Sequence, residues 1–587
     1  MNEASLKNGI RSSLEEIYGK QVAKTWTNRF FLCIKKYLPK DNSFINHPAS
    51  RLEKHYSLLI TYGDSIQSPH CAPLVVLHEF LRKWVGDAVS TIHLLPFYPS
   101  SSDDGFSVID PFSVDTGLGT WDHINDLQAF YALMFDFVAN HLSRSNIWIR
   151  ECFAGNPEYK DFAIFLEGTE DLTQVFRPRN LPLITQVDTD RGKRYVWTTF
   201  SKDQVDVNYH NPEVLYCMMD VLLAYVLQRG ASIIRLDAVA YLWKEIGTNC
   251  IHHEKTHAIV RLFCWLTKNL TKQSFIITET NVPHNENVAY FGDGSDEATL
   301  VYNFSLPPLV FHTFLSQDAS VLGAWAKTLV LPSSSVAFFN FLASHDGIGL
   351  MPVKNLLSDG DVEKMCLHTV KQGGFVSRRS KGDGTESPYE LNINYLSALS
   401  GFTENEPRSL LVSRFKAATA IMVFLKGIPG IYINSLIGSQ NWYGDPELTL
   451  YPRRINREKV SFKTLSKELD DPNSLRSAVL GFHVELLRVR KREPAFSPSS
   501  EQRILALTNS ACFVFLRGSS DDSDKILVLI NVTPHLQRIS IEEVWSKLDC
   551  PFPFDACIDL LEKPITITAK ELVLNPYQVQ LLKTKPF

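Results

Sequence analysis

Four polar clusters, each at the end of a short apolar run, constrain the fold of this chain more than any other feature of its sequence. They span residues 135–141, 233–237, 275–279 and 341–346. Each apolar run has the length and the β-branched or aromatic content of a buried strand. A strand buried on both faces cannot hide charged side chains cheaply, so the clusters are expected at strand ends. Polar groups at the same end of several strands are typical of a parallel barrel with an active site.

The rest of the chain predicts an α/β fold in which strands and helices alternate. Helical patterns lie between most of the candidate strands, for example over 212–229 and 254–270. Eight such units in order predict a (β/α)8 TIM barrel. The candidate strands are 57–61, 91–97, 133–137, 232–237, 275–279, 299–304, 336–342 and 429–433.

Composition changes along the chain indicate additional domains around the barrel. Residues 1–50 have apolar residues at helical spacing and predict a helical N-terminal extension. The barrel is assigned to 51–141 and 211–495. The long segment 142–210 predicts an inserted domain over the barrel mouth, because a loop of this length is usually functional. Short strands separated by turns predict an all-β domain over 496–587. A second long stretch, about 372–397, is expected to be irregular.

Charge and hydropathy exclude several classes of partner. The 587 residues carry a net charge of −5, with a pI near 6.4, so nothing favours nucleic acid or an anionic membrane. No apolar stretch reaches the ~20 residues of a membrane span, and the first residues do not resemble a secretory signal. The ten cysteines are scattered and lack zinc-site spacing. We expect free thiols, a cytoplasmic location and no metal site.

The clusters at 233–237 and 275–279 each supply a carboxylate. Arg235 and Asp237 are two residues apart and share one face of their strand, so the guanidinium should lower the pKa of Asp237. An ionised carboxylate suits a nucleophile, although a buried structural ion pair is equally compatible. Glu279 at the end of an apolar strand should have a raised pKa and could donate a proton. Its alternative role is to cap the next helix.

The two remaining clusters carry imidazole and carboxylate groups. His345 and Asp346 could hold sugar hydroxyls and a transition state, or satisfy one another in a core. Asp136, Asn140 and His141 form a similar group, in which Asp136 could be purely structural. Taken together, two carboxylates at neighbouring strand ends are the minimum equipment for cleaving a glycosidic bond.

The order of the four clusters resembles that of the α-amylase superfamily, glycoside hydrolase family 13. The resemblance runs from about residue 55 to the C-terminus. It implies that Asp237 is the nucleophile, Glu279 the general acid/base and Asp346 the transition-state stabiliser. It also implies that His141, Arg235 and His345 line the subsite that holds the transferred glucose.

Further stretches resemble the sucrose-phosphorylase branch of this family, at 93–100, 103–110 and 118–123. The resemblance implies that Asp103 or Asp104, together with Phe106, closes a pocket for a single glucose; the alternative for the two aspartates is a solvated turn. Within the branch, the glucosylglycerate phosphorylases are most similar, over 247–257, 278–284, 304–309, 387–395 and 453–457.

The implied reaction is a double displacement with retention, in which phosphate as co-substrate opens a covalent glucosyl-enzyme and no cofactor is needed. Retaining enzymes need the two carboxyls only ~5 Å apart. Phosphate and glycerate are anions and need cationic groups; we expect Arg457 to contact phosphate, with Arg453, Arg454, Arg378 and Arg379 as further candidates. Glu390 and Asn392, in the segment 389–394, are expected to bind the acceptor, and the glycines at 373–374 to make that loop flexible.

Several alternatives stay open from the sequence. The acceptor could be fructose, fructose 6-phosphate or glycerol instead of glycerate, since the acceptor loop and not the catalytic cluster decides this. A plain hydrolase or transglucosidase would release glucose without phosphate. A catalytically inactive scaffold would be expected to lack one of the three carboxylates, which are all present. The expected partners are a small glucoside and phosphate, and the inserted domain could mediate a homodimer.

Overall fold

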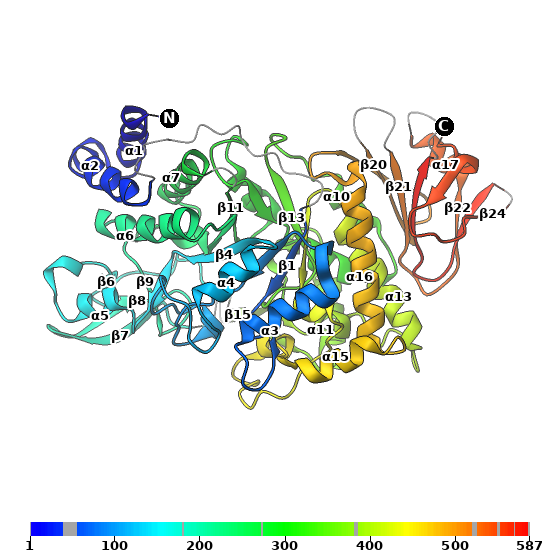
Figure 1. Ribbon diagram of the computed structural model, residues 1–587, viewed down its shortest axis with the longest axis horizontal. Helices are drawn as coiled ribbons and strands as arrows, with labels where there is room; N and C mark the ends of the chain where they lie inside the picture. The colour runs from blue at the N-terminus through cyan, green and yellow to red at the C-terminus, as the bar shows by residue number, and fades with distance from the viewer. Residues whose placement is uncertain are drawn as a thin grey trace.

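A closed barrel of eight parallel strands forms the centre of the molecule (Figure 1). The computed structural model describes residues 2–38, 56–178, 181–271, 274–380, 385–518, 525–548, 552–568 and 570–584. The predicted (β/α)8 barrel is confirmed, because each predicted strand overlaps one barrel strand. In order around the barrel the strands are β1 (Leu58–Thr61), β17 (Ile428–Tyr432), β13 (Ala337–Phe341), β12 (Leu300–Tyr302), β11 (Phe275–Thr278), β10 (Ile233–Asp237), β4 (Ala132–Val138) and β3 (Thr91–Leu94).

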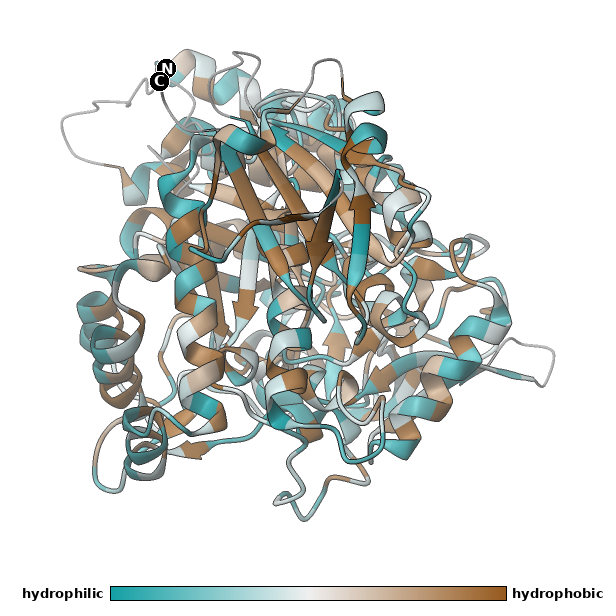
Figure 2. Cartoon of the chain, turned by 90° about the vertical axis from the view of Figure 1, so that its right-hand side faces the viewer, coloured by the Kyte–Doolittle hydropathy of each residue, from teal (hydrophilic) through white to brown (hydrophobic). Residues whose placement is uncertain are grey.

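The barrel strands are short and almost entirely buried, as expected for a parallel sheet covered by helices. Figure 2 shows long hydrophobic stretches on the strands and mixed colouring on the helices. Strand β3 ends at Leu94, three residues before the predicted end at Phe97, because Pro96 has no N–H to donate to a neighbouring strand.

Two of the outer helices begin where the sequence predicts. Helix α7 spans Glu254–Leu270, as expected. Helix α6 (Pro212–Leu223) continues as a π-helix over Ala224–Gln228. The predicted range 212–229 is therefore one continuous helix that changes from α-helical to π-helical hydrogen bonding. Asn211 caps α6 by accepting a hydrogen bond from the Glu213 N–H at 3.0 Å.

The N-terminal extension is helical and packs on the outside of the barrel. Helices α1 (Glu3–Tyr18) and α2 (Lys20–Tyr37) lie against α7 and α6, at the upper left of Figure 1. The Tyr18 hydroxyl donates a hydrogen bond to the Tyr209 carbonyl at 2.7 Å. The remaining part of the predicted extension, from residue 39 to 50, lies outside the described residues.

The segment between β4 and β10 forms a small β-rich unit. Strand β5 (His141–Ser143) pairs with β9 (Gln204–Asp206), and β8 (Gly192–Trp197) lies between β6 (Phe165–Leu166) and β7 (Ile184–Thr189). The predicted boundary at 141/142 falls inside β5. The exact limits of the inserted domain therefore stay a prediction.

The stretch after β13 is a hairpin, so the expectation of an irregular segment over 372–397 was wrong. Strands β15 (Phe375–Ser380) and β16 (Glu386–Asn392) pair antiparallel, and β16 also pairs with β14 (Ile348–Gly349). The register shifts between Ser377 and Arg378, which interrupts the alternation that would have marked these strands. A side chain at Gly374 would lie 2.9 Å from the Asn392 carbonyl, so close packing of the hairpin requires this glycine.

The C-terminal region forms two antiparallel sheets, shown at the right of Figure 1. One sheet has the order β19 (Glu501–Leu505), β20 (Cys512–Gly518), β21 (Ile526–Asn531), β26 (Val579–Thr584) and β23 (Cys557–Asp559). The other has the order β22 (Gln537–Ser540), β25 (Glu571–Leu574) and β24 (Thr566–Thr568). The predicted strand-rich C-terminal region is confirmed.

Two buried arginines, one of them from these sheets, donate to the carbonyl end of a barrel helix. Arg517 on β20 donates hydrogen bonds to the carbonyls of Phe424 and Ser497, at 2.8 and 2.7 Å. Arg490, on α16 (Leu475–Arg492), donates to the Val423 carbonyl at 2.6 Å. Val423 and Phe424 end α13 (Arg408–Phe424), where the helix dipole favours cations. The pair therefore caps the helix that leads into barrel strand β17.

Candidate active site

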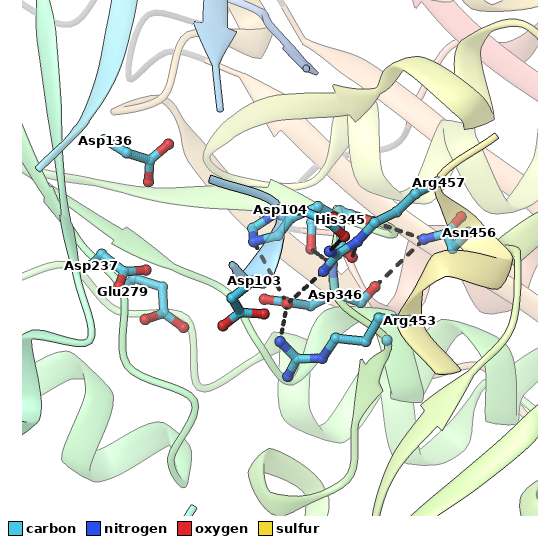
Figure 3. A network of polar contacts seen from close by, with 12 residues as sticks. Asp103, Asp104, Asp136, Asp237, Glu279, His345, Asp346, Arg453, Asn456 and Arg457 are labelled. Carbon is cyan, nitrogen blue, oxygen red and sulfur yellow. Dashed lines mark hydrogen bonds and ion pairs between the residues drawn. The ribbon is translucent and has the colours of Figure 1, made fainter. Parts of the chain in front are cut away.

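The carboxyl ends of β10, β11 and β13 open into one pocket, as expected for a barrel enzyme (Figure 3). The structure brings nine of the predicted site residues together in its wall. They are Asp103, Phe106, His141, Arg235, Asp237, Glu279, His345, Asp346 and Arg457.

Asp237 is held by a buried arginine at the end of β10. The Arg235 Nη1 atom donates to Asp237 Oδ1 at 2.7 Å and also contacts Asp136, which in turn contacts His93 Nε2 at 2.7 Å. Arg235 lowers the pKa of Asp237, as expected. Burial raises this pKa by more, so the net pKa of Asp237 lies above its usual value, which the sequence did not predict. Asp136 is fully buried and serves this network, in line with a structural role.

Glu279 lies beside Asp237 and faces the same pocket (Figure 3). Its Oε2 atom accepts a hydrogen bond from the Ala238 N–H at 3.0 Å and lies 4.0 Å from Arg235 Nη2. Burial raises the pKa of Glu279 to about 7, against the influence of Arg235, and the negative charges of Asp237 and Asp346 add to the rise. The expected raised pKa is confirmed. Glu279 can therefore both donate and accept a proton near neutral pH.

Asp346 lies opposite this pair and is surrounded by cations. Arg453 Nη1 contacts Asp346 Oδ1, and Arg457 Nη2 lies 3.9 Å from the same oxygen. Although burial raises it, the pKa of Asp346 is held well below its usual range, first by Arg453 and then by His345 and Arg457. Burial lowers the pKa of His345 to about 3, so this imidazole is neutral. Asp346 therefore stays ionised while Glu279 titrates.

An aromatic ring and one short polar contact complete the side of the pocket next to His345. The Phe106 ring stacks on His345 with centroids 4.7 Å apart and planes inclined by 10°. Gln204 Nε2 donates to Asp103 Oδ2 at 3.1 Å. Asp103 and Asp104 both have positive φ, 54° and 46°, which is strained for residues with a side chain. Strain at two successive residues is typical of a site that needs a side chain aimed in one direction.

His141 is oriented by a buried network that reaches Lys244. His141 Nε2 lies 3.1 Å from both the Phe106 carbonyl and Gln204 Nε2, and Nδ1 lies 3.2 Å from Asn140 Nδ2. Asn140 Nδ2 also donates to Asp206 at 3.0 Å. The Lys244 ammonium contacts both Asn140 Oδ1 and Asp206 Oδ2, each at 2.5 Å. Lys244 thereby compensates the buried charge of Asp206 and holds the Asn140 amide against His141.

The wall next to Phe106 contains an ion pair between Asp104 and Arg457. Arg457 Nη1 contacts Asp104 Oδ2, and its Nε donates to the His345 carbonyl at 2.7 Å. Asp104 also accepts from Arg454 Nη2 at 3.1 Å. Asp103 lines the active-site pocket, whereas Asp104 lines a neighbouring pocket that shares Arg457.

Glu390 and Asn392, both predicted to bind substrate, are not brought into this pocket. Both are buried on β16. The Glu390 carboxylate is occupied by Arg453, at 2.8 Å from Nη2, and by the Gly347 N–H at 2.6 Å. Asn392 Nδ2 donates to Ser377 Oγ at 2.8 Å across the hairpin. Their side chains therefore stabilise the hairpin and Arg453, and direct contact with a ligand would need them to be released.

Of the other arginines that were predicted to contact phosphate, Arg453 lines the pocket. Arg454 does not, because it pairs with Asp104, Asp445 and Glu447. Arg378 and Arg379 lie on β15 and are absent from the pocket wall, and the Arg379 guanidinium lies 5.8 Å from the centre of the Phe176 ring.

The pocket-lining residues that sequence reasoning did not single out include Gln204, Tyr241 and Asn281, whereas Tyr389 lies in the segment 389–394 that was expected to bind the acceptor. None of them ends a long apolar run. Asn281 could have been found, because it follows Glu279 by two residues at a strand end.

The arrangement can break a glycosidic bond by paired carboxylate chemistry. One carboxylate, Asp346, stays ionised, and Glu279 can exchange a proton beside Asp237. Among the described residues, no group of three or more His, Cys, Asp or Glu side chains is arranged to hold a metal ion. Within the same part of the chain, no helix is long and apolar enough to cross a membrane, and none of the nine cysteines forms a disulfide.

Comparison with known proteins gives consistent results. Residues 85–346 match the family described as "Alpha amylase, catalytic domain". A glucosylglycerate phosphorylase from Spirochaeta thermophila is 47% identical over 93% of this chain and 90% of its own length. A glucosylglycerate phosphorylase from Escherichia coli is 40% identical over 98% of this chain and 100% of its own length.

Among solved structures, sucrose 6F-phosphate phosphorylase from Thermoanaerobacter thermosaccharolyticum has a TM-score of 0.69 at 25% identity. The match covers 82% of this chain and 94% of that one. The resemblance found in the four strand-end clusters is thus confirmed: the chain belongs to the α-amylase family, glycoside hydrolase family 13, in the group that contains the glucosylglycerate phosphorylases.

Proposed function

We propose that the protein is a retaining glycoside phosphorylase that transfers glucose from 2-O-α-D-glucosyl-D-glycerate to phosphate. The products are α-D-glucose 1-phosphate and D-glycerate. The observation that carries this proposal is the pair Asp237 and Glu279 on neighbouring strands, in which burial raises the pKa of Glu279 to about 7. The choice of glycerate is supported by two relatives of at least 40% identity that are glucosylglycerate phosphorylases.

In the first step, an oxygen of Asp237 attacks the anomeric carbon of the glucosyl unit. The bond from that carbon to the glycerate oxygen breaks, and Glu279 gives its proton to the departing oxygen. The result is a glucosyl ester of Asp237 and free D-glycerate. A carboxyl with a pKa near 7 suits this role, because it is protonated in a large fraction of molecules at neutral pH yet is a stronger acid than an alcohol.

In the second step, a phosphate oxygen attacks the same carbon and the ester bond to Asp237 breaks. Glu279, now a carboxylate, accepts the proton that hydrogen phosphate loses. Two inversions give net retention. Both steps balance with glucoside and phosphate alone, so the proposal needs no cofactor.

The remaining pocket residues hold the sugar and the developing positive charge. Asp346, which is kept ionised by Arg453 and Arg457, stabilises the oxocarbenium-like transition state. His345, His141 and Arg235 would bind sugar hydroxyls. Asp103 and Phe106 would close the pocket around one glucose, and Arg457 fixes the adjoining wall through Asp104.

An acceptor panel tests the proposal. The protein is incubated with α-D-glucose 1-phosphate and, in separate reactions, D-glycerate, glycerol, fructose and fructose 6-phosphate, and phosphate release is measured. We expect D-glycerate to give the highest kcat/KM. Faster release with fructose 6-phosphate would favour the second candidate, an enzyme like the structural relative of 25% identity. Glucose release that does not depend on phosphate would instead indicate a hydrolase.

The proposed setting is the cytoplasm, with a small glucoside and phosphate as the partners and without nucleic acid or membrane. A homodimer formed through the inserted domain stays a proposal that sedimentation analysis would test.

A further inference from the structure

Arg453 differs from the other arginines that line the described part of the pocket. The side chain of Arg235 is 3% exposed and that of Arg457 is 7% exposed, whereas that of Arg453 is 27% exposed. All three arginines are paired: Arg235 with Asp136 and Asp237, Arg457 with Asp104 and the His345 carbonyl, and Arg453 with Asp346 and Glu390. Of these three side chains, that of Arg453 is the most accessible to a ligand that enters the pocket.

The orientation of the Arg453 side chain is fixed by Glu390. Its Nε and Nη2 atoms both donate to the Glu390 carboxylate, at 3.0 and 2.8 Å from the nearer oxygens. Glu390 is itself buried and anchored by the Gly347 N–H at 2.6 Å. This bidentate pair occupies one edge of the planar guanidinium and directs Nη1 toward Asp346 and the pocket, as Figure 3 shows for Arg453 and Asp346.

The charge of the pocket makes such a group necessary for an anionic substrate. Asp237 is esterified when the second substrate arrives, but the carboxylates of Glu279 and Asp346 still face that space, so an entering carboxylate or phosphate is repelled. A guanidinium next to Asp346 offsets this repulsion at the place where the acceptor approaches the anomeric carbon. Arginine also offers several donors in one plane, which matches the oxygens of a carboxylate or a phosphate.

We propose that Arg453 binds the anionic group of the second substrate, either the carboxylate of glycerate or phosphate, and that Glu390 is its positioning residue. This inference rests on the proposed phosphorylase function and deepens it. It moves Glu390 from direct substrate contact to a role exerted through Arg453. It also names Arg453 in place of Arg457 as the anion contact.

D-glycerate and glycerol form a matched pair of acceptors, because they differ only in a carboxylate that is replaced by a hydroxymethyl group. Both are supplied together to the enzyme with α-D-glucosyl fluoride as donor, and the ratio of glucosylglycerate to glucosylglycerol is measured. The two products arise from the same glucosyl-enzyme, so effects of a substitution on the first step or on Asp346 cancel. We expect R453Q to lower this ratio by about 10- to 100-fold, the value of a hydrogen bond to a charged group.

Phosphate is tested in the same way. The ratio of α-D-glucose 1-phosphate to glucosylglycerol, with phosphate and glycerol in competition, is expected to fall by a similar factor in R453Q. If R453Q does not turn over glucosyl fluoride, R453K carries the test. It keeps the charge next to Asp346 but loses the planar donor arrangement, so a smaller fall in both ratios is expected.

Arg538 supplies the control. It lies on β22 in the C-terminal sheet, pairs with Glu571 at 3.4 Å and is absent from the pocket wall, so R538Q is expected to leave both ratios within about twofold of the wild type. Unchanged ratios in R453Q and R453K, or a fall in R538Q instead, would overturn the assignment. The wild-type enzyme reports separately on the proposed function: if it forms no glucose 1-phosphate from phosphate, the function fails, whatever the variants do.

The role of Glu390 is tested by a double-mutant cycle. E390Q keeps the shape of the side chain but weakens its grip on Arg453, and we expect the glycerate-to-glycerol ratio to fall by a few-fold. Adding E390Q to R453Q should change the ratio no further. A full effect of E390Q in the R453Q background would show that Glu390 acts independently of Arg453.

Discussion

The Nη1 atom of Arg235 lies 2.7 Å from Oδ1 of Asp237, and the same nitrogen contacts the buried carboxylate of Asp136. One guanidinium thus compensates two carboxylates, one of which faces the pocket. Burial nevertheless raises the pKa of Asp237, so the arginine limits the cost of keeping this group ionised and does not remove it.

Replacing Asp237 by Asn should abolish turnover and alter its neighbour. We expect kcat to fall by about 10⁴-fold or more, because no ester can form. The charge of Asp237 helps to raise the pKa of Glu279, so this pKa should fall below about 7 in the variant. Kinetics and NMR titration of the Glu279 carboxyl check the two parts. A wild-type rate in the folded variant would contradict the assignment.

Glu279→Gln should slow the release of a leaving group that needs a proton more than the release of one that does not. With glucosylglycerate as donor, the variant should lose about 10²–10⁴-fold in rate, the usual contribution of a general acid. Fluoride leaves without protonation, so formation of the glucosyl-enzyme from α-D-glucosyl fluoride should be much less affected. Rapid-quench measurements compare the two donors. Equal losses with both would argue against a general-acid role for Glu279.

The same substitution should stabilise the protein at alkaline pH. The folded state binds a proton at Glu279 with a pKa of about 7, more tightly than the unfolded chain does. The folded protein therefore loses stability as pH rises from about 4.5 to 7, by up to about 3 kcal/mol. Glu279→Gln has no charge to bury, so its Tm should exceed that of the wild type at pH 8 and approach it at pH 5. A constant Tm difference across this range would contradict the burial argument.

Lys244→Met should destabilise the fold through Asp206. Asp206 is fully buried, and removing the ammonium 2.5 Å away leaves its charge without that cation, at a cost of about 3–5 kcal/mol. Chemical denaturation measures the loss. Lys36→Met is the matched control, because Lys36 pairs with Asp220 at 3.3 Å on an exposed surface and should contribute about 1 kcal/mol or less. Similar losses in both variants would argue against the buried network.

The barrel could be predicted from the sequence because its strands are buried on both faces. Such strands appear as unbroken apolar runs, and a polar residue that ends one, such as Asp237 or Glu279, is conspicuous. The β15–β16 hairpin could not be predicted, because a bulge between Ser377 and Arg378 and several polar residues hide its alternation.

Two residues of the site, Gln204 and Glu390, show what the sequence could not predict. Gln204 comes from a three-residue strand in the insertion. Nothing in the sequence around it indicates that its side chain contacts His141, which lies 63 residues earlier in the chain. Glu390 was expected to meet substrate because of its place in the acceptor segment. The sequence contains no sign that Arg453, from a distant segment, occupies its carboxylate.

The pair Arg490 and Arg517 has a consequence for how the protein could be dissected. The carbonyls of Val423 and Phe424, which lead into the strand that closes the barrel, receive their donors from α16 and from a strand of the C-terminal sheet. The inner residues of β20 and β21, such as Phe515 and Val528, also share one apolar core with the barrel, so a fragment that ends at the last barrel helix would expose that apolar surface and leave the Phe424 carbonyl without its donor. The catalytic barrel is therefore not a separable module, and exchanging C-terminal domains between relatives would require an arginine at the position of Arg517.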